Sequence, residues 1–144
     1  MDITEVKDDL HAFTNEPVIS GTLDELNIEM DSTPLPCVYL TRLEQGGRLA
    51  EHNGFLLERQ TYGIFFADKG EHRSDVGYTD DDIIARRKNV CMKWLLHAMR
   101  SDVFKLIETG STARRYDEFD AGVVGFGVIV TLEERHPVVT ICDL

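Results

Sequence analysis

The feature that most constrains the fold is a long helical pattern in the middle of the 144-residue chain. Over residues 79–108, apolar side chains recur at the three- and four-residue spacing of an amphipathic helix. This stripe comprises Ile84, Cys91, Trp94, Leu95, Ala98 and Met99. Thr79 offers a hydroxyl cap and three aspartates follow it, which favours a helix N-terminus. We expect either one helix that ends near Gly110 or two helices, the second capped by Ser101-Asp102 and starting at Val103.

Upstream of this helix, the sequence predicts a shorter helix and two strands. Residues 3–13 place Ile3, Val6, Leu10 and Phe13 at helical spacing. The segments "PCVYLTRLE" and "FLLERQTYGIFFADKG" are rich in residues that favour strands. Between them, "QGGRLAEHNG" predicts a loop or a hairpin connection. Residues 22–35 fit a helical turn or an edge strand, and the polar residues 68–79 predict a surface loop.

Downstream of the long helix, the polar stretch "STARRYDEFD" predicts a connection, and the chain then returns to β-structure. Residues 123–132 predict a strand, and "HPVVTICDL" predicts a last short one. The expected order is α-β-β-α-β-β. It predicts an α+β fold, an antiparallel or mixed β-sheet with a long helix packed on one face, as a single-layer α/β sandwich. The length suits a single domain over residues 1–144, with residues 1–21 as an N-terminal helix and connecting arm.

Charge and hydropathy exclude several classes of protein. The net charge is -11, which opposes binding to the phosphate backbone of DNA or RNA. The longest apolar runs are about five residues, too short to span a bilayer. The N-terminal "MDITEVKDDLHAF" lacks the basic and then apolar order of a secretory signal, so we expect the chain to fold in the cytoplasm.

A glycine-rich segment, "DAGVVGFGVIVTLEERH", raises the question of a phosphate-binding loop. Such a loop lies between a strand and a helix, so that backbone N–H groups and the helix N-terminus converge on the anion. Here Gly122, Gly125 and Gly127 lead into a strand, and no lysine-threonine or lysine-serine pair follows. We therefore expect no nucleotide site. Instead, the face with Gly125 and Gly127 should lie against another backbone, a neighbouring subunit or the long helix.

The cysteines and histidines do not form a recognisable catalytic or metal-binding motif. Cys37, Cys91 and Cys142 lie far apart between apolar neighbours, which is typical of small buried side chains. The five histidines are scattered without zinc spacing. His97 borders the apolar stripe and is expected to be a structural histidine with its hydrogen bonds satisfied.

One loop carries the side chains of a hydrolytic triad, Glu71, His72, Ser74 and Asp75, but its polar composition explains them equally well. No nucleophile elbow surrounds the serine. The acidic run from Asp80 to Asp82 is explained by the helix N-terminus rather than by a bound cation. We expect no catalytic residues, no cofactor and no metal.

The dense basic spots of this acidic chain are Arg114-Arg115 and residues 86–88, where Arg86, Arg87 and Lys88 are expected to form a solvated patch. They could pair with acidic neighbours in the same fold or dock on an acidic surface of another copy. Both alternatives remain open. The residues predicted for a subunit interface are Gly122, Gly125, Phe126, Gly127, Arg114 and Arg115.

Over roughly residues 20–135, the chain resembles the small tail-terminator and minor-tail (head–tail joining) proteins of tailed bacteriophages and prophages. The resemblance lies in the order of "TLDELNIEM", "PLPCVYLTRLE" and "RQTYGIFFADKG", then the long helix, then "FDAGVVGFGVIVTLEER". An aspartate and a glycine open the strand that ends in "TLEER". In that family, a helix on a sheet builds one subunit of a ring at the end of the tail tube.

The resemblance implies a non-enzymatic structural protein of the virion tail, assembled in the cytoplasm of the bacterial host. Its partners would be further copies of itself and neighbouring tail-tube or head–tail connector proteins, with residues 44–53 and 68–79 as contact loops. An acidic lumen would let DNA slide by repelling phosphate. Two alternatives are a small bacterial adaptor or ligand-binding module on an α+β scaffold, and a hydrolase that uses the His72 loop.

Overall fold

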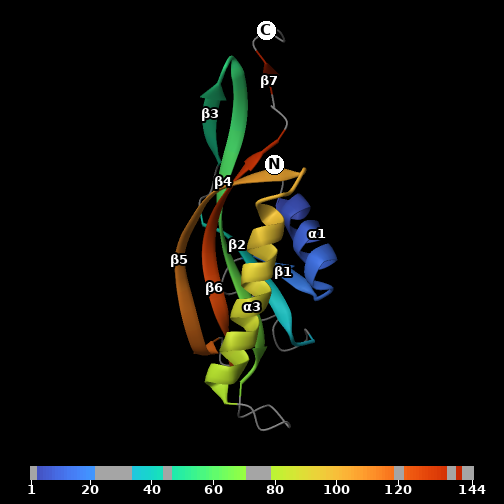
Figure 1. Ribbon diagram of the computed structural model, residues 1–144, viewed down its shortest axis with the longest axis vertical. Coiled ribbons are helices and arrows are strands. Elements are labelled where there is room, and N and C mark those ends of the chain that lie inside the picture. The colour runs from blue at the N-terminus through green and yellow to red at the C-terminus, as the bar shows by residue number, and fades with distance from the viewer. Residues whose placement is uncertain are drawn as a thin grey trace.

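The structure is a computed structural model that describes residues 3–21, 34–43, 47–70, 79–118, 122–135 and 139–140. These residues form an α+β fold with one mixed β-sheet, as predicted (Figure 1). The elements in chain order are α1 (Ile3–Thr14), β1 (Val18–Ser20), β2 (Cys37–Arg42), β3 (Arg48–His52), β4 (Phe55–Lys69), α3 (Asp80–Ala98), β5 (Phe104–Glu118), β6 (Val123–Glu134) and β7 (Val139–Thr140).

The described strands form a seven-stranded sheet whose main order is β1-β2-β4-β6-β5. β1 pairs with β2 in parallel, and the other pairs are antiparallel. β4 pairs with four other strands. Its second half lies between β2 and β6, whereas its first residues pair with β3 and β7. The sheet is therefore built around β4.

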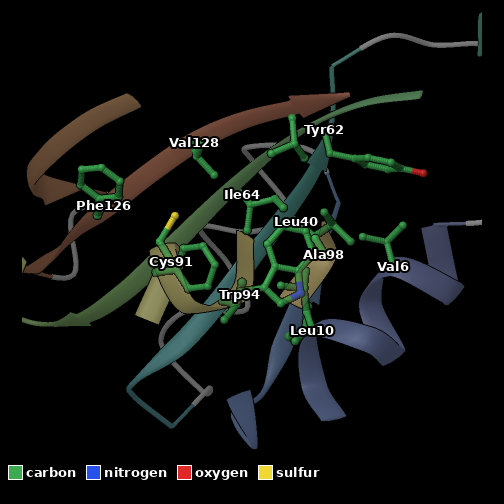
Figure 2. Packing of buried hydrophobic residues seen from close by; sticks show 14 of the residues in the cluster. Val6, Leu10, Leu40, Tyr62, Ile64, Cys91, Trp94, Ala98, Phe126 and Val128 are labelled. Atoms are coloured by element: carbon green, nitrogen blue, oxygen red, sulfur yellow. The ribbon is translucent and has the colours of Figure 1, made fainter. Parts of the chain in front are cut away.

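One face of the sheet, here called the core face, packs with both helices in a single apolar cluster (Figure 2). The strands contribute alternate residues to it, as expected when neighbouring side chains point to opposite faces. Its members from the sheet include Val38, Leu40, Tyr62, Ile64, Phe66, Val124, Phe126, Val128 and Val130. The helices add Val6 and Leu10 from α1, and Ile84, Cys91, Trp94 and Ala98 from α3.

The opposite face of the sheet, here called the second face, carries a smaller apolar cluster. It comprises Ile19, Cys37, Tyr39, Ala67 and Val123, with Leu35 and Phe65 packed against it. Tyr39 and Phe65 stack with their ring centroids 6.0 Å apart. The sheet is therefore apolar on both faces at the end where β2, β4 and β6 run together.

The start of α3 follows the sequence prediction closely. The Thr79 hydroxyl accepts a hydrogen bond from the Asp82 backbone N–H at 3.2 Å, and the Asp82 carboxylate accepts one from the Thr79 N–H at 3.4 Å. This reciprocal capping box satisfies two backbone donors that have no partner within the helix. The acidic run is thus a helix cap.

The prediction of where the long helix ends was wrong. α3 ends at Ala98, and the segment expected to be a second helix and a polar connection forms β5, a strand of 15 residues. A turn follows the helix, in which the Ser101 N–H donates to the Ala98 carbonyl and the Val103 N–H to the Ser101 hydroxyl. Phe104 is then buried beside Trp94. Contact with β6 and the α3 side chains outweighs the helical spacing of this segment.

Other predicted elements are confirmed with small changes of boundary. Residues 3–13 lie in α1, and the predicted strands correspond to β2, β4 and β6. The predicted loop or hairpin connection at 45–54 forms a hairpin in its described part, since β3 pairs with β4 across Asn53-Gly54. Met99, assigned to the apolar stripe, is exposed because the helix has already ended. The predictions for residues 22–33, 71–78 and Cys142 lie outside the described residues.

Candidate subunit interface

The six residues predicted for a subunit interface lie at one end of the β5–β6 pair. The strand register places Arg114 opposite Phe126 and Arg115 opposite Gly125. Gly122 directly precedes β6. These residues, all within positions 114–127, lie side by side because β5 is a strand that pairs with β6, which the sequence did not predict.

Gly122, at the start of β6, is hydrogen-bonded to Gly70, at the end of β4. Its φ angle of 64° lies in the left-handed region, which glycine adopts at little cost. Its carbonyl accepts a hydrogen bond from the Gly70 N–H at 2.8 Å. This glycine therefore has a role within the subunit, as a turn residue.

Gly125 is buried on the second face of the sheet, away from α3. A Cβ atom there would lie 2.2 Å from the Phe66 carbonyl oxygen and 2.8 Å from the Phe65 ring. The close backbone predicted for this glycine is that of β4, and the neighbouring ring fills the remaining space. The alternative that the long helix covers the glycine face was wrong, because α3 packs with Phe126 on the core face.

Phe126 and Gly127 occupy opposite faces of β6. Phe126 is 3% exposed within the core cluster, and the Lys88 ammonium lies 5.9 Å from its ring centroid. Gly127 is half-buried, and a Cβ atom there would meet nothing closer than 3.7 Å. Phe126 thus stabilises the interior of one subunit, and Arg114 is exposed at the surface beside it.

The prediction that residues 86–88 form a solvated patch was wrong for Arg87. This side chain is 4% exposed, and its guanidinium binds both carboxylate oxygens of Glu16 at 2.5 and 2.9 Å. It also donates to the Cys37 carbonyl at 3.4 Å and lies 6.0 Å from the Phe66 ring centroid. A two-pronged ion pair of this kind holds α3 to the connection between α1 and β1. Arg86 and Lys88 are exposed as predicted.

His97 is a structural histidine, as predicted. Its Nε2 lies 3.1 Å from the Asp9 carboxylate, and its ring stacks on Phe13 with centroids 4.7 Å apart. The other Asp9 oxygen accepts a hydrogen bond from the Trp94 indole at 3.0 Å. Asp9 therefore connects α1 to two residues of α3.

The sequence reasoning missed a charged cluster on the second face, where β3, β4 and β6 meet. The Arg59 Nε donates to the Glu133 carboxylate at 2.6 Å, and the His52 Nε2 lies 3.6 Å from the same oxygen. The Glu133 side chain is 5% exposed. β6 was expected to stop at residue 132, but its alternation continues through "TLEE" and places Glu133 opposite Arg59.

Among the described residues, no group of three or more His, Cys, Asp or Glu side chains is placed to hold a metal ion. The triad residues of the His72 loop lie outside the described ranges. No helix in the described part of the chain has the length and apolar character needed to cross a membrane.

The two described cysteines make stability fall at alkaline pH. Burial raises the pKa of Cys37 to about 11 and that of Cys91 to about 12, from an ordinary value of 9.0. Above pH 9 the unfolded chain loses these protons before the folded chain does, so the free energy of unfolding decreases as pH rises. Cys91→Ala should flatten this decrease by up to about 1.4 kcal/mol per pH unit.

Urea unfolding of both proteins between pH 8 and 10.5 measures this difference. The wild-type protein and Cys91→Ala share every other group that titrates at alkaline pH. The difference between their slopes of unfolding free energy against pH therefore reports the Cys91 thiol. Parallel profiles above pH 9 would contradict the assignment of a raised pKa to Cys91.

Comparison with known proteins does not identify a family. No protein-family model matches the chain, and no curated protein matches it in sequence.

Proposed function

We propose that this protein is a non-enzymatic structural protein of a phage or prophage tail. In this proposal, it forms a homo-oligomeric ring that terminates the tail tube or joins the tail to the head. The resemblance over residues 20–135 supplies the class of protein, and the β-sheet supplies the means of assembly. The protein would be part of the virion tail and would assemble in the cytoplasm of the bacterial host.

The observation that carries the proposal is the long strand β5 at the edge of the sheet. Among the described strands, β5 pairs with β6 alone, so the outer side of its backbone faces away from the sheet. Such an edge can add a strand from another chain. A ring needs a contact that differs on the two sides of each subunit, and a sheet with unlike edges has this property.

The side chains of β5 favour a selective contact over aggregation. Lys105, Glu108 and Arg114 are exposed along it, and the pairing with β6 shifts register at three places. Charges and bulges prevent an edge from pairing with an arbitrary strand. A partner with matching charges and shape is therefore favoured.

The proposal includes the predicted architecture of a long helix on one face of the sheet, with α3 in that role. It also includes neighbouring tail-tube or head–tail connector proteins as partners, and neither sequence-specific nucleic-acid binding nor membrane association. The net charge of -11 supports a lumen that repels DNA phosphates and lets the genome slide.

Electron microscopy of the concentrated full-length chain tests this function. We expect closed rings of uniform diameter, either from the protein alone or when tail-tube protein is present as a template. Tube protein by itself is the control. A chain that stays monomeric in both samples would contradict the proposal and favour the small adaptor or ligand-binding module.

A further inference from the structure

The β3–β4 hairpin extends past the ends of both helices (Figure 1). Its turn is Asn53-Gly54, where both residues have positive φ angles, 52° and 86°. This is the backbone that a two-residue turn between twisted strands requires. The hairpin exposes large apolar side chains, since Leu49 is 68%, Phe55 45% and Leu56 39% accessible.

The strand register gives the hairpin two different faces. Leu49 pairs with Glu58, and Glu51 pairs with Leu56. Because cross-strand partners point to the same side, these four residues form one face, here called the acidic face. It lies on the same side as the core face, since Glu58 alternates with Gln60 and Tyr62 along β4.

The other hairpin face, here called the basic face, lies on the side of the second face. Its pairs are Arg48 with Arg59, Ala50 with Leu57 and His52 with Phe55. Glu133 forms an ion pair with Arg59 and offsets one positive charge of the basic face. Lys105 lies opposite Glu133 on the far side of β6, which adds a further cation to this row.

Both faces thus combine apolar side chains with a net charge, which is negative on the acidic face and positive on the basic face. Leu49 and Leu56 share their face with Glu51 and Glu58, whereas Phe55 and Leu57 share theirs with Arg48 and Arg59. Two acidic faces or two basic faces would repel one another when water is removed from between them. An acidic face and a basic face attract, and the apolar side chains of each would then be removed from water.

We propose that the hairpin is a self-association site, in which the acidic face of one copy binds the basic face of the next. The partner is a second copy because one chain carries both halves of the contact. Unlike faces give a head-to-tail contact that can continue from subunit to subunit. This inference rests on the proposed function and names a contact between subunits in addition to the edge of β5.

A charge exchange tests the pairing. The variants are Arg48→Glu, which removes the net positive charge of the basic face, and Glu51→Lys, which removes the net negative charge of the acidic face. Both side chains are exposed, so neither change disturbs the core. Each variant alone should self-associate at least about tenfold more weakly than the wild-type protein. An equimolar mixture should regain association, because the two variants then have complementary faces.

Sedimentation velocity over a range of concentrations measures these associations, and thermal unfolding verifies that each variant is folded. Lys93→Glu, on the exposed side of α3, is the control for a change of charge away from the hairpin. It should leave association unchanged. Higher salt should weaken the wild-type association by screening the charges.

The outcomes separate this inference from the proposed function. Rings that form equally well from both single variants would overturn the hairpin contact and leave the ring function standing. Charge-dependent association without closed rings, with or without tube protein, would keep the contact and overturn the ring. A wild-type chain that is monomeric at every concentration would overturn the contact. Electron microscopy with tube protein would then decide whether the ring proposal holds.

Discussion

Replacing Arg87 with alanine is expected to lower the free energy of unfolding by about 3–5 kcal/mol, the cost of breaking a buried ion pair. The substitution leaves the Glu16 carboxylate, which is 15% exposed, without its cation. It also removes the donor to the Cys37 carbonyl and the contact with the Phe66 ring. Urea unfolding followed by circular dichroism measures the loss.

The adjacent Arg86 is a matched control, because the same change is made at an exposed position one residue away. Arg86→Ala should alter stability by no more than about 0.5 kcal/mol. The double variant Arg87→Met, Glu16→Leu should recover much of the loss, since apolar residues can replace a buried pair at little cost. Equal effects of Arg87→Ala and Arg86→Ala would contradict the buried ion pair.

Gly125→Ala is expected to destabilise the protein by about 3 kcal/mol, at the upper end of what overpacking costs. The added methyl group would lie 2.2 Å from the Phe66 carbonyl oxygen, so β4 and β6 must separate locally. The Phe65 ring, at 2.8 Å, would have to leave its stacked position against Tyr39. Thermal unfolding should show the loss as a lower melting temperature.

Gly127→Ala gives the comparison within the same strand and on the same face. A methyl group at this position meets its nearest atoms at 3.7 Å, an ordinary contact distance. Since alanine restricts the unfolded chain more than glycine does, the effect should lie within about 1 kcal/mol of zero and can be favourable. A Gly125→Ala protein as stable as Gly127→Ala would show that β4 and β6 do not approach as closely as the structure places them.

The two ends of the long helix show what local sequence can predict and what it cannot. Its start at Thr79 was predictable, because capping depends on residues within one turn. Its end was not. The helical spacing continues past Ala98, but Phe104 packs against Trp94 and Leu106 packs against the core cluster. Both residues also pair with β6, a strand far along the chain. Tertiary packing decides such a boundary.

The charged residues show the same limit. Arg86, Arg87 and Lys88 are equivalent in the sequence, but only Arg87 points toward Glu16 and is buried. Glu133 and Arg59 form an ion pair across 74 residues, which no motif in either strand indicates. The two charged faces of the hairpin follow from the register of β3 on β4, because a shift of one residue would move the β3 side chains to the other face and mix the charges.

By itself, the sequence determined the properties that depend on neighbouring residues: the N-cap of α3 at Thr79, the turn at Asn53-Gly54, the apolar stripe of α3 and the β-structure of the segments that became β2, β4 and β6. It also argued against a nucleotide loop at Gly122 to Gly127, because a strand follows these glycines. The tertiary structure alone decided which side chains meet across the sheet. Those contacts join residues distant in the chain, and they stabilise the protein only once strand order and register are set.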